Sequence, residues 1–287
     1  MSFDMRLPVR KLVLTTLYAT ALAVIVLYAW EGSSYYSTPL IERPRHEDYW
    51  TLKPGGSRGH ALGIAGSSLM VVMLVYSVRK RTKALRGAGK LRDWLDFHIF
   101  CGVIGPLLVV LHSSFKVHGL VALSFWSMVV VALSGVLGRY LYLQIPRTRA
   151  GDQLSLAEVE ELNADLTRRL REELGEAPLQ ELEALAAGSL KPGTPLLPLL
   201  LRMPVEGVRL RWRLRSFRRR YRRHGGSTEL LRTIRQKALL QRRLLLWSRL
   251  QELFHHWHVL HKPFAVVMYV FMIVHIVVAV LTGYAWQ

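Results

Sequence analysis

The chain alternates long apolar runs with short polar segments. Five runs have the roughly 20 residues that a helix needs to cross a bilayer, and they cover residues 12–30, 60–78, 95–115, 119–143 and 263–285. Hydrophobic residues make up 51% of the 287 positions and are concentrated in these runs. The pattern predicts an all-α membrane protein with about five transmembrane helices.

One long polar segment separates the fourth and fifth predicted spans. We therefore divide the chain into residues 1–145 with the first four transmembrane helices, an insertion at residues 146–262, and residues 263–287 with the fifth helix. Because this insertion is the only sizeable polar part, we expect it to fold outside the membrane.

Local patterns predict the elements of the insertion. Residues 154–185 have helical periodicity with glutamates at the polar positions, and residues 191–204, rich in proline, leucine and glycine, predict a linker. Residues 208–215, VRLRWRLR, alternate apolar residues with arginine and predict a strand, which RRRYRRHGG ends. A long helix from 227 to 261 is expected to continue directly into the fifth span.

Basic residues predict the orientation of the spans. Arg6, Arg10 and Lys11 precede the first span, and seven basic residues separate the second and third: Arg79, Lys80, Arg81, Lys83, Arg86, Lys90 and Arg92. Cytoplasmic loops are enriched in Lys and Arg, so we expect the N-terminus and residues 146–262 in the cytoplasm and the C-terminus outside, in a bacterial-type inner membrane. The first span is too long for a signal-peptide core and is expected to remain uncleaved.

Two of the spans each contain a pair of histidines at the same interval. His98 and His112 are fourteen positions apart, as are His261 and His275. At about 100° and 1.5 Å per residue, this interval puts both imidazoles within about 40° on one helix face and about 21 Å apart along the axis. The third and fifth spans are expected to run parallel, so each histidine has a counterpart at equal depth.

Two haem b groups, each bound by one histidine from each span, account for this pattern. We expect His98 and His261 to bind the inner haem, and His112 and His275 the outer one. Cys101 is the only cysteine, so iron–sulfur clusters and covalently attached haem are excluded within this chain. Alternatively, each histidine only hydrogen-bonds a neighbouring helix. Four of them at one interval favour the haem interpretation, because ionisable groups inside a membrane are costly and usually functional.

Residues near the histidines predict further parts of the haem sites. Gly102 and Gly105 lie within about 40° of His98 on the helical wheel, which leaves room for a porphyrin edge, although close helix packing has the same requirement. Arg139 is placed to neutralise a haem carboxylate, as is Lys262, and snorkelling to lipid headgroups is the alternative. Pro263 is expected among the first residues of its helix.

The other histidines and methionines near the spans are not expected to bind haem. Met268 and Met272 are expected to pack as apolar side chains. His255, His256 and His258 do not share the face of His275 and are expected at the membrane interface. A quinone site near His60, His118 or the 255–258 cluster is a weaker possibility.

The histidine spacing resembles that of a known superfamily. Paired HX13H motifs on two membrane helices, here His98/His112 and His261/His275, are similar to the membrane core of ferric reductases and NADPH oxidases, and more loosely to other bacterial di-haem cytochromes b. The resemblance covers roughly the second to fifth spans and implies one-electron transfer across the bilayer through two bis-histidine haems. The sequence has no Gly-rich dinucleotide fingerprint, so flavin chemistry is not expected within it.

The net charge of +19 bears on the partners. Arginines beside a membrane attract anionic lipid, and they would also suit an acidic electron-transfer protein; nucleic acid is not expected. Three functions remain open: an electron-transfer subunit of a larger redox complex, linked to donor and acceptor proteins or the quinone pool; a quinol oxidoreductase in its own right; and a cofactor-free membrane anchor with an arginine-rich docking domain.

Overall fold

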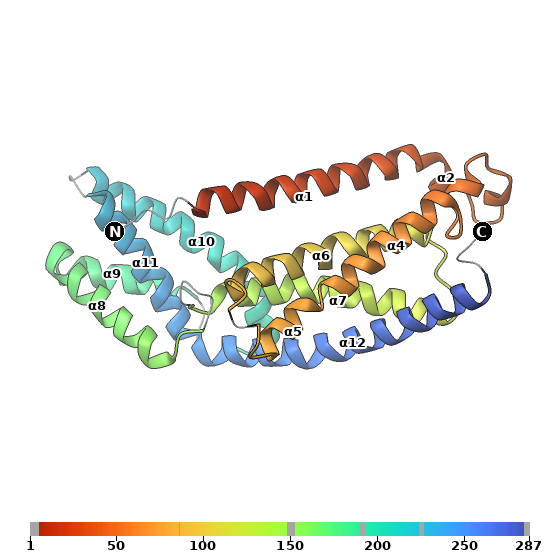
Figure 1. Ribbon diagram of the computed structural model, residues 1–287. Coiled ribbons are helices and arrows are strands. Elements are labelled where there is room, and N and C mark those ends of the chain that lie inside the picture. Colours follow the sequence, from red (N-terminus) through yellow and green to blue (C-terminus); the bar gives the residue numbers. More distant parts are fainter. Residues whose placement is uncertain (1–5, 86, 148–152, 190–192, 224–226, 284–287) are drawn as a thin grey trace. The chain divides into compact units, whose positions relative to one another are not determined.

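The computed structural model describes residues 6–85, 87–147, 153–189, 193–223 and 227–283, and these are almost entirely helical (Figure 1). The helices are α1 Arg6–Glu31, α2 Ser33–Ser37, η1 Arg43–Arg45, α3 Tyr49–Leu52, α4 Ser57–Val72, α5 Val75–Arg81, α6 Leu91–His112, α7 Leu120–Gln144, α8 Leu156–Leu174, α9 Glu176–Ala187, α10 Leu196–Arg223, α11 Thr228–Leu245 and α12 Trp247–Leu281. Within these ranges the β structure amounts to one isolated bridge, between Arg147 and Gln153. The all-α prediction is confirmed.

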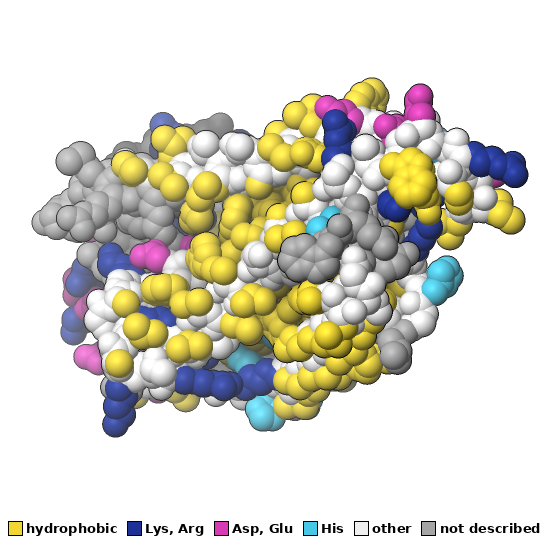
Figure 2. All heavy atoms as spheres, turned by 45° about the vertical axis from the view of Figure 1, so that its right-hand side comes forward, with side chains coloured by type: hydrophobic (Ala, Val, Ile, Leu, Met, Phe, Trp, Pro, Cys, Tyr) yellow, Lys and Arg dark blue, Asp and Glu magenta, His cyan; other side chains and the backbone are white. Residues whose placement is uncertain are grey.

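Five segments are long and apolar enough to cross a membrane: Leu12–Glu31, Tyr49–Arg81, Leu91–His112, Val121–Gln144 and Trp247–Leu281. Few of their apolar side chains are buried and many are exposed, and hydrophobic side chains cover much of the face drawn in Figure 2. Water would make such a surface costly, whereas lipid tails would not. The predicted number of spans is confirmed.

The chain forms two compact units. Unit 1 comprises Met1–Val136 and Leu260–Gln287, and unit 2 comprises Leu137–Val259. The domain boundaries predicted from the sequence, after residues 145 and 262, lie further along the chain than these unit boundaries. Helices α7 and α12 each contribute residues to both units.

In unit 1, α4 and α6 pack with their backbones in contact. A Cβ atom on Gly66 would lie 2.9 Å from the carbonyl oxygen of Gly105, and a Cβ on Gly105 would lie 3.1 Å from the oxygen of Gly66. Small residues at such a crossing let membrane helices approach closely. On the other side of α6, Tyr18 of α1 packs edge-on against Phe100, with ring centroids 5.1 Å apart.

Three features of the spans differ from the prediction. Helix α6 ends at His112 and not at 115, because Ser114 and Phe115 adopt left-handed backbone conformations with φ of 47° and 59°. The second span is interrupted between α4 and α5. Pro263 lies deep inside α12, which begins at Trp247, so its placement near a helix start was wrong.

Unit 2 contains helices α8 to α11, whose apolar faces enclose a core (Figure 1). The helical segment predicted at 154–185 is two helices, α8 and α9, which Gly175 divides with a φ of 82°. The linker predicted at 191–204 was wrong from Leu196 onward, where α10 begins; its residues 191–192 lie outside the described part of the chain.

The strand predicted at 208–215 was also wrong, because these residues belong to α10. Leu210 and Leu214 are buried, whereas Val208 and Trp212 are exposed. An alternating pattern puts all four on one face of a strand, but only residues three or four apart share a face of a helix. The buried positions Leu199, Met203, Glu206, Leu210, Leu214 and Phe217 follow the helical spacing.

A buried amine joins three helices of unit 2. Lys237 of α11 donates hydrogen bonds to Asn163, Thr167 and Gln241 at 3.1, 2.6 and 3.2 Å, and it pairs with Glu183 of α9 at 2.8 Å. Helix α11 ends at Leu245 and α12 begins at Trp247, so the helix predicted over 227–261 contains one break, at Leu246.

Candidate functional site

Two of the four paired histidines meet in unit 1. The rings of His112, the last residue of α6, and His275 of α12 have centroids 6.5 Å apart and planes inclined by 61°. Gly59, near the start of α4, also contacts His112, through its carbonyl oxygen. Helices α6 and α12 therefore bring one histidine each to the same level.

His112 is held by a hydrogen bond to the backbone. Its Nδ1 lies 2.8 Å from the carbonyl oxygen of Gly59. A carbonyl oxygen only accepts, so Nδ1 carries the hydrogen and Nε2 has a free lone pair. Gly63, one turn further along α4, has no side chain, and a Cβ there would lie 2.6 Å from Nδ1 of His112.

His98 has the same arrangement at the other end of α6. Its Nδ1 lies 3.1 Å from the carbonyl oxygen of Met73, at the end of α4, and its ring lies 5.2 Å from that of Tyr76. Nδ1 is again the donor, and Nε2 again has the lone pair.

His261 is held by a side chain of α7. Its Nδ1 lies 2.7 Å from Oγ of Ser134, and that Oγ lies 2.9 Å from the carbonyl oxygen of Val131. The single hydrogen of the Ser134 hydroxyl has two acceptors within reach, the Val131 carbonyl oxygen and Nδ1 of His261, so this contact orients the His261 ring without assigning its tautomer. His98 and His112 carry the hydrogen on Nδ1, which is the tautomer that metal-binding histidines use when their other nitrogen is fixed by a neighbour.

Buried methionines lie between the two histidine levels. Met70 of α4, Met128 of α7, and Met268 and Met272 of α12 form one apolar cluster. On α12, Met268 is seven residues from both His261 and His275. Met268 and Met272 pack as apolar side chains, as the sequence predicted.

The predicted glycines differ in what they contact. Gly105 lies against Gly66 in the crossing of α4 and α6, which is the helix-packing role that the sequence left open. Gly102 is less crowded, because a Cβ there would be in ordinary contact with Sδ of Met73 at 3.7 Å. The room next to His112 is provided instead by Gly63, which sequence analysis missed. Its spacing from Gly66 on α4 marks one helix face, but no sequence signal connects that face to His112.

The other candidates have contacts of their own. Arg139 belongs to unit 2, where its guanidinium lies 5.6 Å from the ring centre of Tyr142. His256 and His258 donate from Nδ1 to carbonyl oxygens four residues earlier in α12. His255 and His118 are exposed. The roles predicted for Arg139 and for these histidines stay predictions.

The separation of the His112 and His275 rings is compatible with two imidazoles bound to one metal ion. Bonds of about 2 Å from a metal to two imidazole nitrogens place the ring centroids roughly 6–7 Å apart, and 6.5 Å lies in that range. Rotation about the metal–nitrogen bonds permits any angle between the ring planes. Haem takes only two ligands from the protein; among the described residues, no group of three or more His, Cys, Asp or Glu side chains is arranged to hold a metal ion.

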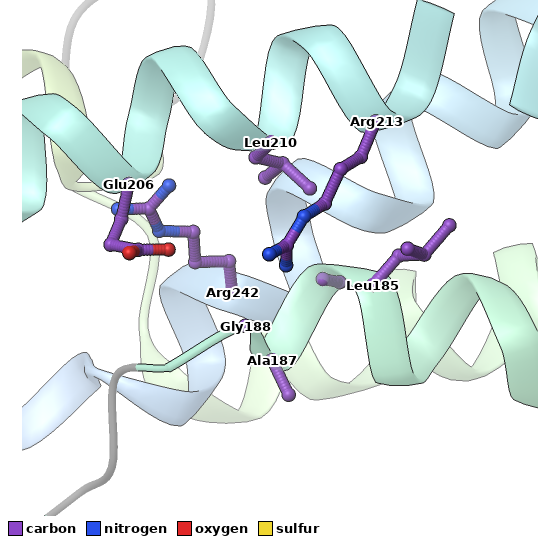
Figure 3. A pocket seen from close by; sticks show the side chains of 8 residues that line it. Leu185, Ala187, Gly188, Glu206, Leu210, Arg213 and Arg242 are labelled. Carbon is purple, nitrogen blue, oxygen red and sulfur yellow. The ribbon is translucent and has the colours of Figure 1, made fainter. Parts of the chain in front are cut away.

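Unit 2 contains a small hollow between α9, α10 and α11 (Figure 3). The side chains of Glu206 and Arg242 lie beside one another in it, and that of Arg213 reaches in from α10. Arg242 donates to the carbonyl oxygen of Met203 at 3.0 Å, while Arg209 donates to Glu206 at 2.7 Å. The hydrogen bond from Arg209 lowers the pKa of the Glu206 carboxyl, and burial lowers the pKa of the Arg242 guanidinium.

Comparisons with protein-family models, with curated proteins and with solved structures gave no match to this chain.

Proposed function

We propose that this chain is a b-type cytochrome that transfers electrons across a membrane through two haems. His112 and His275 bind one haem, and His98 and His261 bind the other. The observation that carries the proposal is the 6.5 Å separation of the His112 and His275 rings. When bound, each haem would supply a one-electron redox centre held by two histidines, which suits electron transfer better than substrate binding at iron.

The protein prepares its ligands for this role. In His98 and His112 the Nδ1 atom is engaged by a carbonyl oxygen, so the ring is oriented and Nε2 is the nitrogen that faces iron in the proposal. Oγ of Ser134 orients the ring of His261. A hydrogen bond at Nδ1 also makes Nε2 more basic and therefore a stronger ligand.

The apolar cluster between the two levels has a complementary role. Met70, Met128, Met268 and Met272 are buried and keep water away from the interior of the bundle. Low polarity around a redox centre is one of the means by which a protein sets its potential. In the orientation that the basic residues predict, the His112 level is nearer the outside and the His98 level nearer the cytoplasm.

Absorbance spectra of the purified protein test the proposal. The reduced-minus-oxidised spectrum should show b-type bands, and the pyridine haemochrome should give two haems per chain. His112→Gly should lose one haem and leave the other, and added imidazole should restore the lost one. His46→Gln, which changes a histidine outside both levels, should keep both haems. Full haem content in the double variant H98A/H112A would contradict the proposal.

The same hydrogen bonds favour a second candidate, a cofactor-free membrane anchor. The bonds from His98 to Met73, from His112 to Gly59 and from His261 to Ser134 each join two helices, which is what purely structural histidines would do. This candidate predicts a colourless protein, so the same spectrum separates the two.

A further inference from the structure

Helix α10 presents a second apolar face that none of the described residues of unit 2 covers. Five side chains on it are half or more exposed: Leu197 67%, Leu201 68%, Val205 51%, Val208 50% and Trp212 66%. Their spacing of four, four, three and four residues places them in a stripe about 80° wide. The buried positions of α10 lie on the opposite face, about 180° away.

Arginines border and extend this stripe. Helix α10 contains ten arginines and a single acidic residue, Glu206. Arg209 and Arg211 lie about 80° to either side of the centre of the stripe, and Arg215 and Arg219 continue its line toward the end of the helix. All four are exposed. An apolar stripe with arginine on both sides is the pattern of a helix that lies in the headgroup region of a bilayer.

The packing of α10 places its first turns beside two membrane spans. On its buried face, Leu199 and Met203 belong to one cluster with Leu141 and Ile145 at the end of α7 and with Leu250 of α12. The candidate spans Val121–Gln144 and Trp247–Leu281 include Leu141 and Leu250. Since a helix is about 10 Å across, the exposed stripe lies about one helix diameter from the ends of these spans.

We propose that α10 lies in the surface of the same bilayer that the spans cross, with its stripe among the acyl chains and its arginines on anionic lipid headgroups. Two observations favour lipid as the partner of this face: the positive charge of α10, and the apolar cluster that α10 shares with the ends of the spans. The arginines attract the anionic surface, and the apolar stripe selects lipid over a purely charged partner.

Spin labels on the full-length protein in lipid nanodiscs test this placement. In a Cys101→Ser background, single cysteines replace Leu201 and Trp212 on the stripe, and Ala164 on the exposed face of α8 is the matched control. The collision rate of each spin label with oxygen, which concentrates in lipid, is compared with its collision rate with a water-soluble nickel chelate. In discs containing phosphatidylglycerol, the oxygen-to-chelate ratio at 201 and 212 should exceed that at 164 several-fold. Replacing Arg211, Arg215 and Arg219 with glutamine should lower it toward the control.

Two results would overturn the proposal. Equal ratios at 201, 212 and 164 would mean that the stripe faces water, as expected for a surface that awaits a protein. Spin–spin broadening between labels on neighbouring copies would mean that a second chain covers the stripe. Far-UV circular dichroism of each labelled variant verifies that the helices are retained.

Discussion

The backbone of Gly63 lies against the imidazole of His112, so that a Cβ on Gly63 would stand only 2.6 Å from Nδ1. Gly63→Ala should therefore displace the ring and weaken its bond to Gly59. Overpacking of this kind costs about 1–3 kcal/mol, which should lower the midpoint of thermal unfolding in detergent. Under the proposed function, this variant should also lose the haem at the His112 level, which the haemochrome assay measures.

Gly102→Ala is the matched control for this change. The nearest atom to a Cβ on Gly102 is Sδ of Met73 at 3.7 Å, an ordinary contact. The unfolding midpoint and the haem at the His112 level should be retained. If the two alanine variants behaved alike, the close approach of Gly63 to His112 would have no functional importance.

A second close approach is between Gly138 of α7 and Trp257 of α12. A Cβ on Gly138 would overlap the indole, so Gly138→Ala should separate the two helices and reduce stability by about 1–3 kcal/mol. Gly135→Ala, one turn earlier on the same helix, meets no atom within 4 Å and should be neutral or slightly stabilising, because alanine favours helix. Thermal unfolding of both variants measures the difference.

The spans and the histidine pairs could be predicted because each depends on one periodicity of one helix. The apolar runs define the number of spans, and fourteen residues fix the relative face of His98 and His112 whatever surrounds them. The bonds at Nδ1 could not be predicted, because the carbonyls of Gly59 and Met73 and the hydroxyl of Ser134 reach the histidines only through tertiary packing.

The error in α10 has a specific cause. In VRLRWRLR, Leu210 and Leu214 are four residues apart and share a face in both a strand and a helix. Two residues that decide between them, Leu199 and Met203, lie in the segment 191–204, whose prolines indicated a linker. Pro198 falls in the first turn of α10, where a missing N–H costs little, and Pro204 is tolerated within the helix.

The buried Lys237 side chain should stabilise unit 2. Lys237→Met should remove the ion pair with Glu183 and leave the buried oxygens of Asn163 and Thr167 without their donor. The Glu183 side chain is 37% exposed, so water can solvate its carboxylate once the ion pair is lost. We therefore expect the free energy of unfolding to fall by about 2 kcal/mol. Arg235→Met, at an exposed position of α11, should have little effect. Hydrogen exchange in α8, α9 and α11 should become faster in the first variant alone.

Glu206 should make the stability of unit 2 depend on pH. The hydrogen bond from Arg209 lowers the pKa of this buried carboxyl below its ordinary value. A depressed folded-state pKa gives stability that is fully present above the ordinary pKa and is lost as the pH falls through the folded-state value. Urea unfolding from pH 7 to pH 3 should therefore show a smaller acid-dependent loss in Glu206→Gln than in the wild type. Glu160→Gln, at an exposed position of α8, should follow the wild type.

Arg43 controls where α6 ends. This buried side chain donates to the backbone oxygens of Tyr36, Thr38 and Ser114, and Ser114 also donates to the carbonyl oxygen of Leu52 at 2.7 Å. These bonds stabilise the left-handed backbone at Ser114, two residues after His112.

Arg43→Met should leave three carbonyls without their donor and release this turn, at a cost of about 2–4 kcal/mol. Because His112 is the last residue of α6, the disturbance should reach the His112 level and spare the His98 level at the other end of the helix. Under the proposed function, the spectrum of only one haem should broaden or disappear. Arg45→Met, an exposed neighbour on η1, should change neither. Equal loss of both haems would mean that Arg43 stabilises unit 1 as a whole and has no particular effect on the end of α6.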